Sequence, residues 1–454
     1  MILSKYFQNL DLKNLNVEFC DVRIEWNRST SIRYIDGDLN ACVERPSLGA
    51  FIRIFNKGRW NFLSTTHLQN LNNIIKQFAI DCRTKPQGPS VFKPPVEVNS
   101  FHGMCSVEQD FYALSLSEKK SNLSSYLELT QSIPNLKNQR VIYSDHQKRK
   151  AYISSVGTSF EFDFSQGGVF IEITIGNGQN NFEDYLGISS DQFGQLKNRQ
   201  IDFINYFQES QKFINASAVT PGKYRVVFCP DVTGTFTHEL FGHKSEADFM
   251  LGDPEAIKLW KIGKIVAPDH LSIVDSGLHF GTSGYSPIDD EGQLATKTYL
   301  IKNGILTGRL HSSETSQVLN ENMTGNARAK DFEYEPIVRM TSTYIENGET
   351  SFSELLKKCD DGLYFKGYRH GSGGSTFTIA PVRTYEIKNG VLGKPLRASA
   401  ISGSLFKTME CIEAVGNNFK LVSSAFGGCG KMEQWPLSVA SGGPSILVSE
   451  MQVG

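Results

Sequence analysis

The stretch TPGKYRVVFCPDVTGTFTHEL, residues 220–240, decides how the chain is divided. Pro221 and Gly222 form a turn signal, the largely apolar run after them is typical of a strand, and the segment after Pro230 leads into a helix. Such a turn between two dissimilar halves suits a domain boundary. We therefore predict an N-terminal domain over residues 1–220 and a C-terminal domain over residues 221–454.

Strand and helix patterns are mixed in the N-terminal half. Hairpin turns are predicted at 36–37 and 56–58, and an amphipathic helix follows, with apolar positions at 68, 71, 74, 75 and 78. Further helices are predicted over about 107–131 and 189–216, strands around 139–144, 150–156 and 159–175, and a linker or surface loop over 83–100. These patterns predict an α/β domain of hairpins and long helices.

The C-terminal half is rich in β signals. Asn-Gly pairs at 303–304 and 389–390 each separate two apolar runs, which predicts two hairpins. The Gly/Ser-rich stretch GYRHGSGGSTF, residues 367–377, is either a mobile loop or a place where the backbone approaches another stretch of chain closely. The expected fold class is α+β, with a β-dominated C-terminal domain that carries the helix around residue 240.

Composition excludes some classes of function. The 454 residues carry 46 basic and 48 acidic side chains, a net charge of −2, which argues against direct binding to nucleic acid or to an anionic membrane. The N-terminus does not have the pattern of a signal peptide, and no apolar run is long enough to span a membrane. The eight cysteines form no C-x-x-C pair, so reduced thiols in a cytoplasmic protein are expected.

The stretch FTHELFGHKSEAD, residues 236–248, carries a candidate metal site. Its H-E-x-x-x-H spacing has one residue more than the H-E-x-x-H pattern of zinc proteases. On a regular α-helix, residues five apart diverge by about 140°, so His238 and His243 could not reach one ion. A π-type turn, or a break near Gly242, would bring both onto one side and leave Glu239 beside the metal as the candidate general base.

The same residues also have a plain structural interpretation. Three polar side chains on an exposed helix face would give this pattern without any metal, and no third ligand is evident nearby. From the residues alone, any of the cysteines could be a remote third ligand. The choice between these interpretations stays open at this level.

Several stretches in the same order resemble the TldD/PmbA family of metallopeptidases. They are FTHELFGHKSEAD, GYSPIDDEGQLATKTYLIKNGILTG, TGNARAKDFEYEPIVRMTSTYIENG, SGSLFKTMECIEAVGNN and FGGCGKMEQWPLSVASGGPSI, together with the N-terminal hairpins. The resemblance covers nearly the whole chain. It implies that Cys429 in GGCGK joins His238 and His243 as a ligand of Zn²⁺, with Glu239 activating a zinc-bound water.

The resemblance also implies substrates and partners. Members of the family act on small or unfolded polypeptides and work as dimers, so we expect a homodimer or a heterodimer with a TldE/PmbA-like subunit. The histidine motif is intact, as in the active, TldD-like subunits. The alternatives are a non-catalytic metal-binding subunit and a regulator associated with nucleic acid, against which the near-neutral charge argues.

Further charged residues are candidates for supporting roles. Metal-bound histidines usually donate their second N–H to a carboxylate. Candidates for this acceptor are Glu246 and Asp248 nearby and Asp289, Asp290 and Glu291 further along, although an acidic turn in water explains the last three equally well. Arg328 and Arg339 are candidates for binding a peptide carboxylate or for structural ion pairs.

Overall fold

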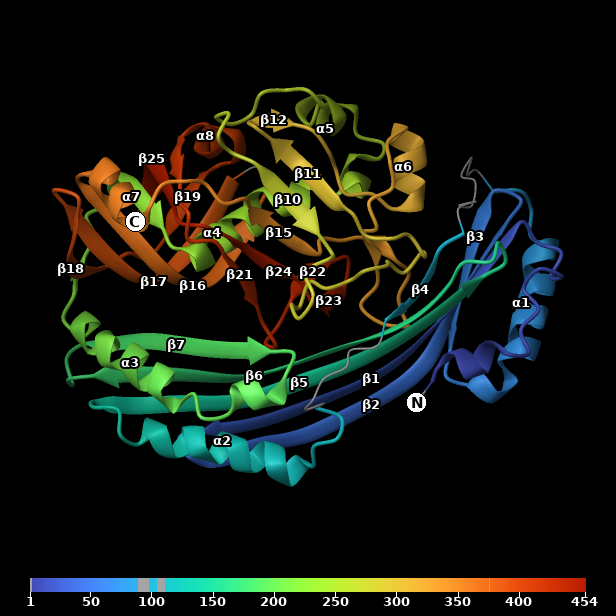
Figure 1. Ribbon diagram of the computed structural model, residues 1–454, viewed down its shortest axis with the longest axis horizontal. Coiled ribbons are helices and arrows are strands. Elements are labelled where there is room, and N and C mark those ends of the chain that lie inside the picture. Colours follow the sequence, from blue (N-terminus) through green and yellow to red (C-terminus); the bar gives the residue numbers. More distant parts are fainter. Residues whose placement is uncertain (1, 89–97, 104–110, 375) are drawn as a thin grey trace.

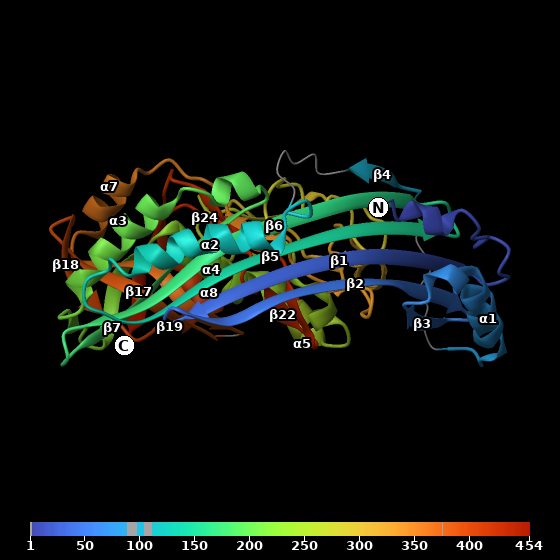
Figure 2. The same cartoon turned by 90° about the horizontal axis from the view of Figure 1, so that it is seen from below.

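A computed structural model describes residues 2–88, 98–103, 111–374 and 376–454. A long, curved sheet from the N-terminal half lies along one side of a second body of shorter strands and helices from the C-terminal half (Figure 1). The architecture is the expected α+β class, with β-structure dominating the C-terminal body. Figure 2 shows that helices cover the opposite, convex face of the long sheet.

Long antiparallel strands form the N-terminal sheet. Its strand order is β3-β2-β1-β5-β6-β4, with β7 paired to β6. The strands are β1 (Phe19–Ile35), β2 (Asp38–Asn56), β3 (Arg59–Thr65), β4 (Ser100–Gly103), β5 (Leu136–Ser154), β6 (Ser159–Gly176) and β7 (Asn181–Ser190). Both predicted hairpin turns are confirmed, because Asp36–Gly37 and Lys57–Gly58 take the positive φ angles that tight two-residue turns need.

Apolar side chains on the convex face pack against the helices. The helical elements are η1 (Ser4–Phe7), η2 (Leu68–Asn70), α1 (Leu71–Thr84), α2 (Leu116–Thr130), η3 (Phe193–Leu196), α3 (Gln200–Ser210) and η4 (Gln211–Phe213). The predicted amphipathic helix is confirmed as α1, which buries Leu71, Ile75 and Ala79. Helix α2 starts later than predicted, at a capping box formed by Ser115 and Glu118. Residues 107–110 of that predicted helix, and 89–97 of the predicted linker, lie outside the described residues.

Two sequence predictions in this half are wrong. The strands predicted at 139–144 and 150–156 are one continuous strand, β5, because β1 and β6 pair with it along its length. The helix predicted over 189–216 is limited to α3, because the residues before it belong to β7 and to the short turn η3. Hydrogen bonding of β7 to β6 and burial of Phe193 and Leu196 outweigh the local helical pattern.

The C-terminal body contains a closed ring of strands. The order β16-β9-β25-β19-β17 closes on itself because β16 also pairs with β17, and β18, β8 and β20 extend it. These strands are β8 (Ser217–Ala218), β9 (Gly222–Phe228), β16 (Gly362–Gly373), β17 (Thr376–Lys388), β18 (Val391–Arg397), β19 (Ile401–Ser404), β20 (Ile412–Val415) and β25 (Ile446–Val453). The predicted Asn389–Gly390 hairpin is confirmed between β17 and β18.

A second C-terminal sheet has the order β12-β11-β10-β15-β24-β21. Its strands are β10 (Ile273–Ser276), β11 (Lys297–Lys302), β12 (Ile305–Leu306), β15 (Ser342–Ile345), β21 (Lys420–Ser423) and β24 (Ala440–Gly443), and Asn303–Gly304 forms the predicted hairpin between β11 and β12. Two small pairs, β13 (Ala327–Arg328) with β14 (Ile337–Val338) and β22 (Cys429–Lys431) with β23 (Gln434–Leu437), complete the β-structure described.

Short helices surround these C-terminal sheets. They are α4 (Pro230–Phe236), η5 (Thr237–Gly242), η6 (His243–Ser245), η7 (Ala247–Met250), α5 (Pro254–Leu259), α6 (Ser313–Leu319), α7 (Phe352–Cys359) and α8 (Leu405–Glu410). No helix in the described part of the chain combines the length and apolarity that a membrane span requires. We propose to keep the domain division at residue 220, although β8, just before it, pairs with β18 of the C-terminal body.

Buried ion pairs join the two bodies. On the concave face of the long sheet, Lys150 Nζ lies 2.6 Å from Asp290 Oδ1, and Arg53 Nη1 lies 2.8 Å from Glu291 Oε1. The Lys150 side chain is 10% exposed and that of Asp290 only 2%. Asp290 also accepts the backbone N–H of Ala329. Each charge is therefore held by a partner from the other body.

We expect Asp290→Ala to destabilise the fold by about 3 kcal/mol, because it removes the carboxylate nearest to the buried Lys150 ammonium and leaves, among the described residues, only Glu25 at 3.7 Å. Urea unfolding followed by circular dichroism measures this change. Asp269→Ala is the matched control, since that carboxylate is 98% exposed, and it should change the free energy of unfolding by less than about 0.5 kcal/mol. Equal stability of Asp290→Ala and wild type would show that the pair does not hold the two bodies together.

Candidate metal centre

Strand β9, which lies between β16 and β25, leads into the helix that carries the histidines. Its end leads directly into α4, where Pro230 occupies the first helical turn and needs no backbone donor there. Helix α4 packs very closely on β24, since a Cβ added at Gly234 would lie 2.8 Å from the backbone N of Gly442. Only glycine therefore allows the helix to sit at this depth.

The helix continues after α4 as a π-helical turn, η5, over Thr237–Gly242. This confirms the irregular helix that the H-E-x-x-x-H spacing predicts. The rings of His238 and His243 lie on one side, with their centroids 5.0 Å apart and their planes at 80°. Gly242 lies against Met340 at the end of the turn: a Cβ there would lie 2.1 Å from the Met340 sulfur, so the Met340 side chain would have to move.

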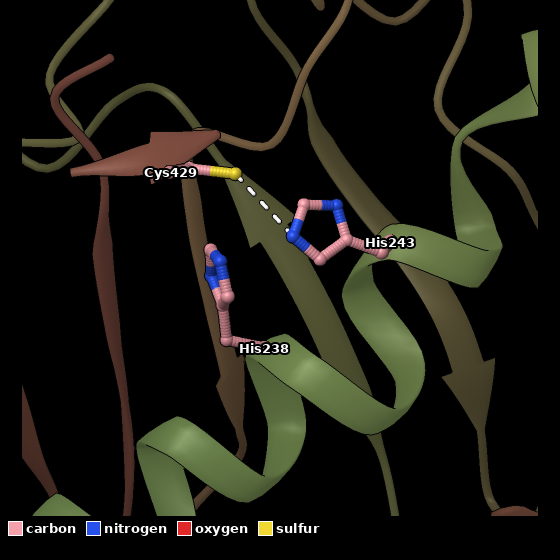
Figure 3. A group of neighbouring side chains, drawn as sticks. All are labelled: His238, His243 and Cys429. Atoms are coloured by element: carbon pink, nitrogen blue, oxygen red, sulfur yellow. Dashed lines mark hydrogen bonds between the residues drawn. The ribbon is translucent and has the colours of Figure 1, made fainter. Parts of the chain in front are cut away.

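Strand β22 brings Cys429 to the two histidines from far along the chain. Ligand atoms of His238, His243 and Cys429 all lie within 4.8 Å of one another. Cys429 Sγ is 3.5 Å from His243 Nε2. Figure 3 shows the thiol and both rings turned toward a common space between the helix and the strand. The three residues that the sequence and the resemblance single out are thus neighbours in space.

Electrostatics in the cluster favour a thiolate. Burial by itself raises the pKa of Cys429, but the charges and hydrogen bonds of His238 and His243 outweigh it and lower the pKa to about 5. Burial likewise lowers the pKa of His243, whereas its contacts with Cys429 and Glu246 raise the pKa to about 10. A thiolate is the form of cysteine that binds metals.

The donor set fits zinc. Two imidazoles and one thiolate are the ligand types that Zn²⁺ prefers, and three protein ligands are the number found in catalytic zinc sites. In the described part of the chain, His238, His243 and Cys429 form the group of His, Cys, Asp or Glu donors that is compact enough to hold one ion.

Glu239 lies beside this cluster beneath a glycine-rich strand. Its side chain is half-buried, and burial raises its pKa, although the neighbouring histidines act in the opposite direction. A Cβ added at Gly373 of β16 would lie 1.9 Å from the Glu239 carbonyl oxygen, and one at Gly371 would lie 2.9 Å from Glu239 Cγ. The glycines at 371 and 373 thus allow the strand backbone to approach Glu239 of the same chain closely.

Glu246 holds the outer nitrogen of His243. Its Oε2 lies 3.3 Å from His243 Nδ1, and its Oε1 accepts the backbone N–H of Met340. Glu246 is fully buried, and despite that burial its contacts with His243 and Lys431 lower its pKa. Asp248 binds Lys431, whose Nζ lies 2.6 and 2.8 Å from its two carboxylate oxygens; within the described residues, no hydrogen bond or ion pair joins Asp248 to a histidine.

The three acidic residues at 289–291 have a role other than supporting the metal ligands. Asp290 and Glu291 bind the lysine and the arginine of the long sheet, as described above. Asp289 accepts backbone N–H groups of Glu291, Gln293 and Ala327, which fixes the turn that carries the trio. In the structure as described, none of the three carboxylates is hydrogen-bonded to His238 or His243. The contacts of Asp290 and Glu291 join the two bodies of the protein, while Asp289 fixes the turn that carries them.

The two candidate arginines are buried and bind backbone carbonyls. Arg339 donates to the carbonyl of Cys429 at 2.8 Å and to that of Gln434, so it holds the strand that carries the thiol. Arg328 donates to the carbonyls of Met340 and Ser438. Within the described residues, neither guanidinium pairs with a carboxylate within 4 Å. The structural ion pairs offered by the sequence are therefore not found in the part of the chain that the structure describes, and both arginines hold backbone carbonyls instead.

Sequence reasoning missed Lys431. Its Nζ lies 3.0 Å from Glu246 Oε2 and also binds Asp248 and the carbonyl of Val338. The available signal was its position two residues after Cys429, because alternate residues of a strand share a face. A lysine is positively charged, as the metal ion is, so a lysine near a metal ligand is no obvious sign of a role at the site.

Comparison with known proteins identifies the class. The protein-family model described as "PmbA/TldA metallopeptidase C-terminal domain" matches residues 221–454, and the one described as "PmbA/TldA metallopeptidase domain 1" matches residues 20–79. Both models are those of a metallopeptidase family, and together they match residues 20–79 and 221–454. The chain is a member of the TldD/PmbA family.

The sequences of relatives agree with this assignment, and solved structures share the fold. A Synechocystis protein named a metalloprotease is 32% identical, covering 96% of this chain and 95% of its own. A Saccharolobus solfataricus protein named a zinc metalloprotease TldD homolog is 28% identical over 100% and 99% of the two chains. In fold, the chain is similar to TldE from Thermococcus kodakarensis (TM-score 0.77, 14% identity, 96% and 97% covered). A Thermotoga maritima protein described as a modulator of a DNA gyrase is equally similar (TM-score 0.77, 20% identity, 96% of each chain).

We expect Cys429→Ala to lower zinc affinity at least about 100-fold, because it removes the one thiolate from the ligand set. Zinc content after dialysis and titration against a chromophoric chelator measure the loss. Cys42→Ala, which alters a half-buried cysteine of the N-terminal sheet, is the matched control and should bind zinc normally. If Cys429→Ala binds zinc as tightly as wild type, the ligand set is wrong.

Proposed function

We propose that the protein is a zinc metallopeptidase of the TldD-like kind, with His238, His243 and Cys429 as metal ligands and Glu239 as general base. The observation that carries this proposal is the position of a half-buried carboxylate next to a cluster of two imidazoles and a thiolate. When bound, zinc supplies Lewis-acid chemistry, polarising a carbonyl and lowering the pKa of a coordinated water.

The roles of the side chains follow from their contacts. Glu239 follows His238 directly in the π-helical turn, so its carboxylate can take the proton of the attacking water and return it to the leaving amine. Burial raises its pKa toward the working range of a base that must also act as an acid. Glu246 accepts the Nδ1 proton of His243, which leaves Nε2 free to face the metal.

The proposed substrates are small or unfolded polypeptides. Close packing of Gly371 and Gly373 over Glu239 supports this choice, because the base lies under a strand and not on an open surface. A segment in an extended conformation fits such a site better than the surface of a folded protein does. A labelled unfolded protein, compared with the same protein folded, tests the preference directly.

We further propose that the working form is a dimer, either of two copies of this chain or with a TldE/PmbA-like subunit. Similarity in fold to TldE supports the second arrangement. Light scattering of the purified chain, alone and mixed with a TldE-like protein from the same source, distinguishes the two. A protein that binds zinc but cleaves nothing in either form would favour the alternative of a non-catalytic metal-binding subunit.

Glu239→Gln should retain zinc and lose about 10²- to 10⁴-fold in kcat/KM, because the amide cannot accept the proton from water. Zinc content and cleavage of a fluorogenic peptide are measured on the same preparation. Glu255→Gln, at an exposed position of α5, is the matched control and should cleave like wild type. Normal cleavage by Glu239→Gln would refute the proposed role of Glu239.

Gly373→Ala should lower kcat/KM at least about tenfold while zinc affinity stays within about twofold of wild type. The reason is steric: the new Cβ would meet the Glu239 carbonyl at 1.9 Å, so the strand must move away from the base, and misplacement on this scale is costly. Gly374→Ala is the control, since its nearest neighbour would lie at 3.8 Å. Equal losses in both variants would mean that the contact with Glu239 is not the cause.

A further inference from the structure

A closed chain of contacts surrounds His243. Cys429 Sγ faces its Nε2 at 3.5 Å, and Glu246 Oε2 faces its Nδ1 at 3.3 Å. The same Oε2 lies 3.0 Å from Lys431 Nζ. Lys431 then leads back along β22 to Cys429, two residues earlier. This closed chain of contacts thus connects two of the candidate ligands, His243 and Cys429, through Glu246 and Lys431.

We propose that Lys431 is a positioning residue of the metal centre, which fixes Glu246 and, through it, the orientation and tautomer of His243 relative to Cys429. The inference rests on the proposed function only in that the cluster holds zinc. It does not depend on which substrate is cleaved, or on whether any is.

The contacts of Lys431 are those of a fully engaged buried cation. Its side chain is 2% exposed. Its Nζ lies 2.6 and 2.8 Å from the two Asp248 oxygens and 2.8 Å from the Val338 carbonyl oxygen, in addition to Glu246. An ammonium has three N–H donors, and these acceptors use all of them. The lysine is therefore held on several sides and cannot move away from Glu246 freely.

Both carboxylate oxygens of Glu246 have hydrogen-bonding or ionic partners. Oε1 accepts the backbone N–H of Met340, while Oε2 is shared by Lys431 and His243. A neutral histidine that binds a metal through Nε2 must carry its proton on Nδ1, and the acceptor for that proton sets the ring orientation. Without the lysine, Glu246 and Asp248 would repel each other in a buried place, and Glu246 would turn away from the ring.

The strand adds a mechanical link. Alternate residues of a strand point to the same face, so β22 presents the Cys429 thiol and the Lys431 ammonium side by side. Residues 338–340 hold this arrangement from the other side. The Val338 carbonyl accepts from Lys431, Arg339 donates to the Cys429 carbonyl, and the Met340 N–H donates to Glu246. A shift of Lys431 would therefore be transmitted to both ligands.

The test measures the metal itself. We expect Lys431→Met to weaken zinc binding about 10- to 100-fold in competition with a chromophoric chelator, the range typical of residues that orient metal ligands. The absorption bands of the Co²⁺-substituted protein should shift, because the geometry at His243 changes. Glu246→Gln should behave similarly, and the double variant should lose no more than the larger single loss, since both act through one contact.

Two further variants make the outcome decisive. Lys223→Met removes an exposed lysine that pairs with Glu450 and should leave both affinity and spectrum unchanged. Lys431→Arg keeps the charge but not the shape of the donor, so it should also shift the Co²⁺ spectrum. It replaces Lys431→Met as the test variant if Lys431→Met does not fold. Affinity within twofold of wild type in Lys431→Met, losses that multiply in the double variant, or full rescue by Lys431→Arg would each overturn the inference.

Failure here is distinguishable from failure of the proposed function. Wild-type protein that binds zinc, shows the expected variant pattern and cleaves no peptide would refute the peptidase and leave the role of Lys431 standing. Wild-type protein that cleaves peptides, with Lys431→Met equal to it in affinity and spectrum, would refute only the role of Lys431.

Discussion

In a regular α-helix, two residues five positions apart lie about 140° apart around the axis, and no rotamer of two histidines overcomes that separation easily. The π-helical turn over Thr237–Gly242 removes this obstacle, and the rest of the site is arranged around it. At its end, Gly242 packs against the Met340 side chain, where a Cβ would lie 2.1 Å from the sulfur. In helix α4, just before the turn, Gly234 packs against the backbone of β24. A single local irregularity thus depends on contacts with two other segments.

Buried contacts also hold the strand that carries Cys429, the third residue of the cluster. Arg339 donates to the Cys429 carbonyl, and Lys431 binds the Val338 carbonyl and the buried Glu246 carboxylate. Buried charges of this kind are expensive unless each has its partner. The arrangement therefore tolerates few alternative conformations, which suits a site that must keep three donor atoms at nearly fixed distances.

The long sheet of the N-terminal half contributes at a distance. Its concave face binds the acidic trio at residues 289–291 through Arg53 and Lys150, and it contacts the C-terminal loops that lead to Cys429, as where Phe170 packs against Phe426. Residues that the sequence offered as supports of the metal thus join the two bodies instead. The site and the domain interface use different acidic residues, although both kinds look alike in the sequence.

Local chemistry of the sequence determined much of what could be predicted. Asn-Gly and Asp-Gly pairs specify tight turns because few residues adopt positive φ, and these hairpins were predicted correctly. The five-residue spacing of His238 and His243 demanded an irregular helix for a purely geometric reason. By contrast, Cys429 was indicated only by the family resemblance, and the tertiary structure brings it to His243 across 186 positions. Only the tertiary structure decided that residues 189–190 finish a strand and that Lys431 completes the contacts. Strand pairing and the partner of a buried charge depend on which surfaces meet after folding, and neither periodicity nor spacing along the chain records that.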